Sequence, residues 1–520
     1  MPANLIAVID VPCVIRNYLR MGRTCAVALW ISLLTISWAG EIISTGWLAK
    51  DTKWKTQFYQ RASSQNGPTV VITGGVHGNE PAGARAAEQI RHWSIKRGRL
   101  IVIPRVNDPG LQDGTRFLPG EPPQRRDLNR QFPKTKAPNE AQGVLGQAVW
   151  KFISEQKPDW VIDLHEGYDF HQINSKSVGS SIIDAKGDEA NVVVPKMLAA
   201  VNASIADPKK KLVRLRYPVD GSLARAAHER LGAAAMILET TTKSQPLSLR
   251  ARQHRLMVHA LLMHLQMAAG TSKVLLPTGA KSLRIAVYDA GGVGGSGPRN
   301  LDRVLRGMPA VLARRVGAED IREGSLTQFD VVIFPGGSGS KQAAALEAKG
   351  RAAVQAFVKD GGGYIGICAG SYLAAANYSW SLGISNHKTF CETIELPNIG
   401  RKSMWYRGPS ATVKMELTEA GRAILGAKSG VFDVRYQNGP IMSPMGVKGL
   451  GAFRTLANFR SEVSRYEPQK GTMVNTPAII AGEYGKGRVL SISPHPESST
   501  ALYSLVANGI RWVGRRPRME

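Results

Sequence analysis

The chain has 520 residues, which at roughly 100–200 residues per domain is enough for two or three domains. Hydrophobic residues make up 43% and charged residues 21% of the sequence, values of folded globular proteins that exclude a collagen-like, disordered or multi-spanning membrane chain. The formal net charge of +27 favours anionic partners, but the sequence has no zinc-finger spacing, no aromatic-interleaved RNA-binding motif and no basic run followed by heptads. We therefore expect no nucleic-acid partner.

The amino terminus carries an apolar run, residues 25–38, that follows three arginines and ends at Ala39-Gly40-Glu41. A basic flank, a short apolar stretch and small residues at its end predict a secretory signal peptide over residues 1–40, and a start at Met21 would give a more ordinary leader. The run is shorter than the about 20 residues of a spanning helix, although an uncleaved membrane anchor and a buried helix remain alternatives. We expect an exported protein, periplasmic or secreted, that contacts a membrane only if this leader stays uncleaved.

Strand-length apolar runs alternate with longer amphipathic stretches over residues 41–270 and again over residues 283–520. The first series contains residues 69–73, 100–103, 160–164 and 234–238, and the second contains residues 283–288, 329–334, 364–367 and 488–492. Between the two series, residues 271–282 are rich in glycine, proline and small polar residues and predict a linker. This alternation predicts two tandem α/β domains, each with a largely parallel sheet covered by helices.

Potential metal ligands follow the strands of the first series. His77 and Glu80 come directly after the strand TVVIT and are three residues apart on one turn, so an imidazole nitrogen and a carboxylate oxygen can face one ion. His165 ends the strand WVIDLH and supplies a third ligand, which leaves the fourth position of a zinc ion open for water. Glu239 ends the strand AAAMILE and could take the proton of the attacking water. All four residues lie where ligands gather in an open α/β sheet, at the carboxyl ends of strands.

Asn129 and Arg130 lie between these motifs and offer amide and guanidinium donors that can hold a substrate carboxylate, while a further arginine can polarise a scissile carbonyl. The motifs HGNE, TRF, DLNRQFP, DLHE and ILET occur in that order over residues 70–270. Here the sequence resembles the zinc carboxypeptidase superfamily, in its succinylglutamate desuccinylase/aspartoacylase-like branch.

This resemblance implies a mixed α/β sheet and a zinc ion held by His77, Glu80 and His165. It also implies Glu239 as general base, Asn129 and Arg130 as carboxylate binders, and Arg116 as the electrophilic arginine. A long spacer separates Arg116 from DLNR, so Arg125 or Arg126 could take that role instead. Glu166, next to His165, could interact with the metal ligands without contacting the ion, or it could be a surface residue with no role in the site.

The second series contains G-x-C-x-G at the end of an apolar strand, with Cys368 at its centre. Glycines on both sides allow the sharp strand-to-helix turn of a nucleophile elbow, and the helix amino terminus favours a thiolate. His495 follows the strand RVLSIS, and Glu497 follows two residues later, so the pair can act as a base and its orienting carboxylate. The sequence has three other cysteines, Cys13, Cys25 and Cys391, too few and too scattered for a disulfide framework.

The loops YDAGGVGGSG and FPGGSGS together with these motifs resemble the flavodoxin-like class I glutamine amidotransferase fold, and most closely the domain at the amino terminus of some biotin-protein ligases. The resemblance covers residues 283–513 and implies Cys368 as nucleophile, His495 as base, Glu497 as its partner and backbone amides near Gly337 and Ala369 as the oxyanion site. A domain that kept the fold and lost catalysis is an equal alternative. The match to G-x-G-x-x-G at residues 292–297 is a weak dinucleotide-binding signal, because a loop over the amidotransferase-like pocket explains it as well.

The sequence therefore predicts a hydrolase that uses zinc to cleave an amide next to a free carboxylate, in a small peptide or an N-acyl amino acid. Cell-wall peptides would be one source of such substrates in an exported setting. The alternatives are an aspartoacylase-like deacylase or esterase, and a binding or regulatory protein with an inactive second domain. The sequence leaves the oligomeric state open.

Overall fold

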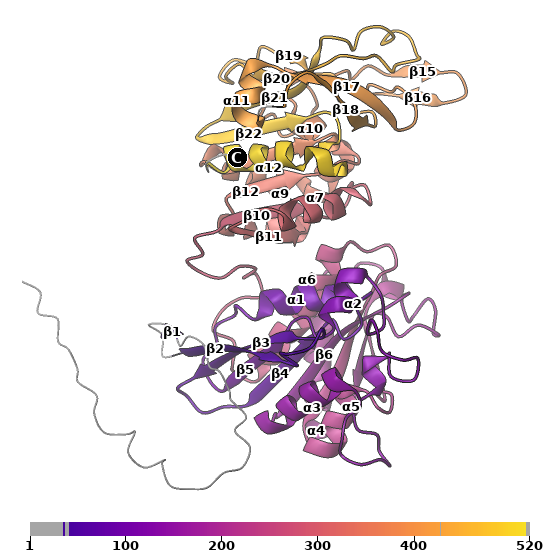
Figure 1. Cartoon of the computed structure of the whole chain (residues 1–520), viewed down its shortest axis with the longest axis vertical. Helices are drawn as coiled ribbons and strands as arrows, with labels where there is room; N and C mark the ends of the chain where they lie inside the picture. The colour runs from indigo at the N-terminus through magenta and orange to yellow at the C-terminus, as the bar shows by residue number, and fades with distance from the viewer. Residues whose placement is uncertain (1–34, 37–40, 427, 516–520) are drawn as a thin grey trace, which may run out of the picture.

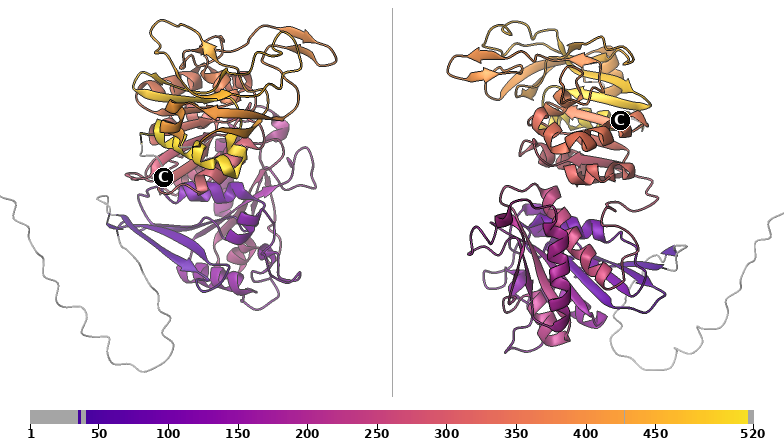
Figure 2. Two further views of the ribbon diagram at one scale, coloured as in Figure 1. Left: turned by 45° about the horizontal axis from the view of Figure 1, so that its top comes forward. Right: turned by 180° about the vertical axis from the view of Figure 1, so that it is seen from behind.

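The computed structural model of the chain describes residues 35–36, 41–426 and 428–515, and within them the chain forms two bodies, each built on a nine-stranded sheet (Figure 1). Figure 2 shows the same two bodies from two further directions. The predicted leader lies outside the described residues apart from strand β1 (Thr35–Ile36). None of the helices in the described ranges is long and apolar enough to cross a membrane.

The first sheet has the strand order β1-β2-β3-β5-β4-β6-β9-β7-β8. Strands β5, β4, β6 and β9 run parallel, whereas β2 and β3 at one side and β7 at the other pair antiparallel with their neighbours towards the centre. The bounds are β2 (Glu41–Leu48), β3 (Thr56–Ser63), β4 (Thr69–Gly74), β5 (Arg99–Ile103), β6 (Trp160–Gly167), β7 (Ser181–Asp184), β8 (Val213–Leu215) and β9 (Ala234–Thr241). The mixed sheet predicted from the sequence is confirmed.

Helices cover both faces of this sheet and bury two separate apolar layers. One layer packs against α1 (Pro81–Ile90), α4 (Asp188–Asn202) and α6 (Leu247–His264), and the other against α3 (Val144–Gln156) and α5 (Leu223–Leu231). Because the central strands are buried on both faces, they are continuous runs of apolar residues, which is why the sequence alone located them. A short helix, α2 (Asp108–Asp113), follows β5.

The second sheet has the order β11-β10-β12-β13-β22-β21-β20-β17-β18. Its first five strands are parallel and the remaining ones antiparallel. The bounds are β10 (Leu283–Tyr288), β11 (Val311–Val316), β12 (Val331–Phe334), β13 (Gly363–Ile367), β17 (Ala411–Leu417), β18 (Val431–Tyr436), β20 (Arg454–Phe459), β21 (Pro477–Tyr484) and β22 (Gly487–Ile492). The parallel half agrees with the predicted flavodoxin-like fold, and the antiparallel half is a feature that the apolar runs did not indicate.

Helices cover both faces of the second sheet as well. One apolar layer packs against α7 (Gly297–Arg306), α11 (Glu419–Leu425) and α12 (Tyr503–Val513), and the other against α8 (Ala318–Arg322), α9 (Gly339–Lys359) and α10 (Ala369–Ala374). Two small sheets complete this body, β14 (His387–Lys388) with β19 (Ser443–Pro444), and β15 (Ile394–Leu396) with β16 (Gly400–Lys402).

The two bodies contact each other through helix α6. Arg255 on this helix is 1% exposed, and its Nη2 atom lies 2.6 Å from Oδ1 of Asp320 on α8. Arg252 forms a second ion pair, 2.6 Å long, with Glu323. Residues 271–282, predicted as a linker, also pack, because Leu275 and Leu276 are buried in the second body.

Candidate metal site and candidate cysteine nucleophile

The end of β4 and the start of α1 place two of the predicted ligands. The loop from Gly74 to Asn79 carries His77, and α1 begins at Pro81, directly after Glu80; proline suits this first helical position because it has no N–H to leave unpaired. Helix α1 then packs very closely on β6, since a Cβ atom at Gly83 would lie 2.3 Å from the carbonyl oxygen of Leu164. This close approach brings Glu80 beside His165 at the end of β6.

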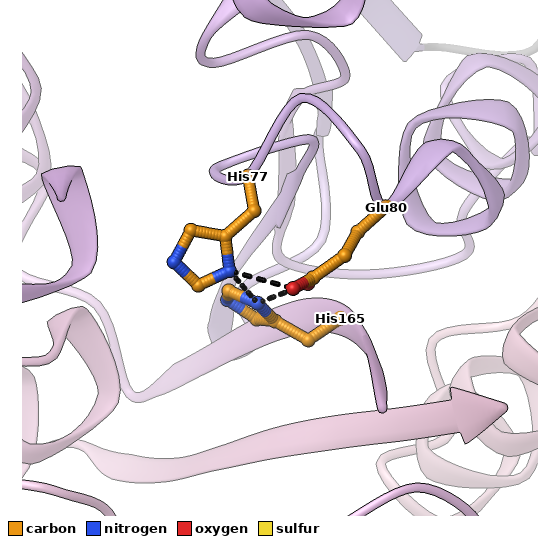
Figure 3. Close-up of side chains that lie close together, drawn as sticks. All are labelled: His77, Glu80 and His165. Carbon is orange, nitrogen blue, oxygen red and sulfur yellow. Dashed lines mark hydrogen bonds and ion pairs between the residues drawn. The ribbon is translucent and has the colours of Figure 1, made fainter. Parts of the chain in front are cut away.

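The three predicted ligands converge (Figure 3). Nδ1 of His77 lies 2.9 Å from one carboxylate oxygen of Glu80, and Nδ1 of His165 lies 2.8 Å from the other. The two Nδ1 atoms are 3.2 Å apart, and all three side chains are buried. His77, Glu80 and His165 form a cluster whose ligand atoms lie within 4.8 Å of one another.

The outer nitrogen of each histidine faces a carboxylate. Nε2 of His165 lies 2.7 Å from Asp163, which also accepts a hydrogen bond from Thr73, and Nε2 of His77 lies 3.0 Å from Asp127. A carboxylate only accepts, so each Nε2 carries a proton, and each Nδ1 would present its lone pair to a bound metal ion. Two lone pairs and a carboxylate that face one point need a cation between them, and this donor set suits zinc.

Charges inside the cluster shift its pKa values. Burial raises the pKa of Glu80, but His77 and His165 outweigh burial and lower it below its usual range. Burial lowers the pKa of His165, but Asp163 and Glu80 outweigh burial and raise it well above its usual range. In the absence of a metal ion this shift favours the protonated form of His165.

Glu239 lies near the end of β9 and lines the same cavity as the three ligands, a space of about 470 Å³. Its Oε2 atom is buried and accepts no hydrogen bond from the described part of the chain. Burial raises its pKa well above the usual value; His165 opposes this shift, while the carboxylates of Glu80, Asp163 and Glu166 add to it. A carboxylate with a free, buried oxygen and a raised pKa is suited to take and return a proton.

The predicted substrate-binding residues Asn129 and Arg130 line the same cavity. They lie on a short 3-10 helix that begins after Asp127, and Oδ1 of Asn129 accepts the backbone N–H of Leu223, which fixes the amide. Arg130 donates to the carbonyl oxygen of Asn129 at 2.7 Å and has no carboxylate partner among the residues described, so its remaining donors are free for a ligand.

Arg116 also lines the cavity, and its Nη1 atom lies 2.8 Å from Glu80. The two alternatives point elsewhere, since Arg125 pairs with Glu121 and Arg126 stacks on Phe117. Of the three arginines, the structure brings Arg116 to the metal cluster. The sequence analysis did not identify Asp127 and Asp163 as partners of the metal ligands. Their positions in the motifs DLNR and DLHE, next to predicted site residues, were the signal that could have indicated this role.

The second body holds a separate cavity of about 560 Å³ with Cys368 at its base. Cys368 lies between β13 and α10 with φ of 51° and ψ of −99°, an uncommon conformation for a residue with a side chain. The glycines of G-x-C-x-G permit this turn, because a Cβ atom at Gly366 would lie 2.3 Å from the carbonyl oxygen of Gly370, and one at Gly370 would lie 2.2 Å from that of Phe334.

His495 and Glu497 lie in the same cavity as Cys368. Nδ1 of His495 is 2.8 Å from Glu497, and both side chains are buried. Burial lowers the pKa of His495, but the interactions with Cys368 and Glu497 outweigh burial and raise it to about 10. Sγ of Cys368 lies 3.5 Å from the carbonyl oxygen of Gln437. Cys391 is exposed and also lines this cavity.

Comparisons with known proteins match the two bodies separately. Residues 66–265 match the family described as succinylglutamate desuccinylase/aspartoacylase catalytic domain, and residues 316–510 match the family described as biotin-protein ligase, N terminal. Both resemblances are confirmed. A curated relative, the N-alpha-acetyl-L-2,4-diaminobutyric acid deacetylase of Halomonas elongata, is 30% identical over 107 residues, which span 19% of this chain and 29% of that protein.

Solved structures also resemble part of the chain. The mDAP-bound form of Helicobacter pylori Csd4, a D,L-carboxypeptidase, aligns with 22% identity over 40% of this chain and 54% of its own, with a TM-score of 0.34. The ectoine utilization protein EutE (DoeB) from Ruegeria pomeroyi, in its product-bound form, aligns with 20% identity over 46% of this chain and 72% of its own, with a TM-score of 0.33.

Proposed function

We propose that the first body, residues 41–270, is a zinc-dependent hydrolase that cleaves an amide bond next to a free carboxylate. One observation carries this proposal: His77, Glu80 and His165 direct a nitrogen, a carboxylate and a nitrogen at one point, and the free carboxylate oxygen of Glu239 shares their cavity. A zinc ion held by these three residues would supply Lewis-acid activation of water and polarisation of the scissile carbonyl.

The protein's own residues would bind the substrate and move the proton. Arg130 and the amide of Asn129 would hold the substrate carboxylate and so fix the distance from that group to the bond that breaks. Glu239 would accept the proton of the attacking water and return it to the leaving amine. Arg116 would donate to the carbonyl oxygen as negative charge develops there, once it exchanges Glu80 for the substrate.

The cavity walls favour a small substrate with an apolar part. Ile183 and Ile237 line the inside, and Tyr168, Val178 and Val219 line the same cavity with large exposed fractions of 57%, 42% and 45%. The curated relative from Halomonas elongata is named for removing an acetyl group from an N-acyl amino acid. We therefore propose an N-acyl amino acid or a short peptide as substrate. An aspartoacylase-like deacylase or esterase would differ in which side of the bond bears the acid.

A second proposal concerns Cys368, and the strained backbone at this residue together with the pair of His495 and Glu497 supports it. In this proposal Cys368 is a nucleophile that attacks an amide carbonyl, His495 is the base, and the backbone amides near Gly337 and Ala369 receive the oxyanion. The rival function for this body is binding or regulation without turnover.

One experiment tests the zinc proposal directly. Native mass spectrometry of the full-length protein, after removal of loosely bound metal, should find one zinc per chain. A screen of N-acyl amino acids and short peptides should then find a substrate that needs its free carboxylate. A protein that carries no zinc, and that gains no activity when zinc is added, would rule the proposal out.

A further inference from the structure

The Glu166 side chain is fully buried and lies in the wall of the cavity that holds the metal cluster. It follows His165 on β6, and its backbone N–H donates to Oε2 of Glu80 at 3.1 Å. Its side-chain Oε2 atom accepts the backbone N–H of Ala82, on the first turn of α1, at 2.7 Å. Glu166 therefore contacts Glu80 directly and also holds the start of the helix that Glu80 precedes.

Arg250, on the first turn of α6, forms an ion pair with the other carboxylate oxygen of Glu166. The Arg250 side chain is 11% exposed, and within the described ranges it is the one cation in an ion pair with Glu166. Without it, Glu166 would be a buried carboxylate close to two others, Glu80 and Glu239, with no ion-pair partner among the described residues. A buried carboxylate without an opposite charge is costly, so the Glu166 side chain would turn away from this position and lose its hydrogen bond with Ala82.

We propose that Arg250 is a positioning residue for the metal ligand Glu80, and that it acts through Glu166. Arg250 fixes the Glu166 carboxylate, Glu166 fixes the first turn of α1, and the first turn of α1 fixes the direction in which Glu80 presents its oxygens. The inference rests on the proposed zinc function. Residues that orient a metal ligand from behind alter metal affinity by roughly ten- to a hundredfold when they are replaced.

The alternative is that Arg250 contributes only to the packing and charge of α6. Arg252 offers a matched control because it lies on the same turn of the helix, is 8% exposed and also pairs with a carboxylate. Its partner is Glu323 in the second body, and it does not contact Glu166. Replacing each arginine by methionine keeps most of the side-chain volume and removes one charge from the same helix in both cases.

The test measures zinc affinity of the full-length protein by competition with a chromophoric chelator, together with the thermal midpoint with and without zinc. We expect Arg250→Met to weaken zinc affinity by roughly ten- to a hundredfold and Arg252→Met to leave it unchanged. Arg250→Lys keeps the charge and should recover part of the loss. If Arg250→Met does not fold, Glu166→Gln should show the loss in its place.

A double variant separates a relay from two independent effects. If Arg250 acts through Glu166, adding Glu166→Gln to Arg250→Met costs little further affinity. Equal losses in the two arginine variants, losses that simply add in the double variant, or unchanged affinity in Arg250→Met would each overturn the inference while wild-type protein still binds zinc. A wild-type protein that binds no zinc would overturn the proposed function and this inference with it.

Discussion

Nδ1 of His77 and Nδ1 of His165 lie 3.2 Å apart, although Asp127 and Asp163 fix the protons of both rings on the opposite nitrogens. Two lone pairs at this distance repel unless a proton or a metal ion lies between them. The burial of both rings makes the repulsion stronger, because little water can screen it.

The first prediction follows from this pair. Since Asp163 and Glu80 raise the pKa of His165, the metal-free protein holds a proton that zinc must displace. Zinc affinity should rise with pH until the pH passes that raised pKa, and binding at neutral pH should release about one proton. Calorimetry in buffers of different ionisation enthalpy measures the release. His165→Ala should lose the bound zinc, and normal zinc content in this variant would contradict the ligand assignment.

Glu239→Gln should separate binding from catalysis. The amide cannot accept a proton, so hydrolysis should fall by roughly 10²- to 10⁴-fold while zinc content stays at the wild-type level. Metal analysis and the turnover rate of the same preparation give the two readings. An active Glu239→Gln enzyme would mean that another carboxylate is the base.

Arg130→Ala should raise KM more than it lowers kcat, since we assign Arg130 to binding of the substrate carboxylate. Loss of a charged hydrogen bond predicts a decrease in kcat/KM of roughly ten- to a hundredfold. Arg126→Ala is the control, because Arg126 stacks on Phe117 and does not line the cavity. An equal effect of the two substitutions would argue for a general influence of positive charge.

If residues 1–40 are a cleaved signal peptide, as we propose, the mature protein should begin near Glu41. This residue is the first of β2. Its carboxylate forms an ion pair with Arg61 and accepts a hydrogen bond from the backbone N–H of Ile95. Amino-terminal sequencing of the protein from its source cells is the measurement. Intact Met1 in a cytosolic fraction would exclude export and the cell-wall substrates with it.

Cys368 should react with iodoacetamide faster than Cys391, although Cys368 is 6% exposed and Cys391 is an exposed residue. The reason is the imidazolium of His495, which persists below its pKa of about 10 and lies in the same cavity as the sulfur of Cys368. The advantage of Cys368 should shrink as the pH rises through that value, and His495→Ala should abolish it. Peptide mapping after brief labelling separates the two sites. Slower labelling of Cys368 would favour a binding or docking role for the second body, and loss of amidase activity in Cys368→Ala would favour catalysis.

The sequence located those parts of the fold that are buried on both sides. The runs at residues 160–164 and 234–238 are apolar throughout and became β6 and β9. Strands β17 and β18 at the edge of the antiparallel half alternate instead: in β17, buried Val413 and Met415 flank exposed Lys414, and no run of apolar residues marks these two strands. The motif HGNE and the residue His165 could be placed at one end of one sheet because parallel strands end at the same edge.

Other parts of the candidate site could not be read from the sequence. Arg250 lies 84 residues from Glu166, and no spacing rule connects the first turn of a helix to the end of a strand that far away. The choice among Arg116, Arg125 and Arg126 depended on the path of the loop between them, which residue types alone do not determine. Side-chain partners across such distances follow from packing, which is fixed only when the whole body is assembled.

Because helix α6 forms ion pairs with the second body, the first body is a poor choice for expression on its own. A truncated protein that ends near residue 270 would leave the guanidinium groups of Arg252 and Arg255 facing water on a surface built for Asp320 and Glu323. Such a fragment would expose a cationic surface that can bind other molecules non-specifically. It would also lack Leu275 and Leu276, which pack in the core of the second body. Poor yield or precipitation of that fragment would result from the loss of these contacts. Its failure to hydrolyse a substrate would therefore not be evidence against the zinc site.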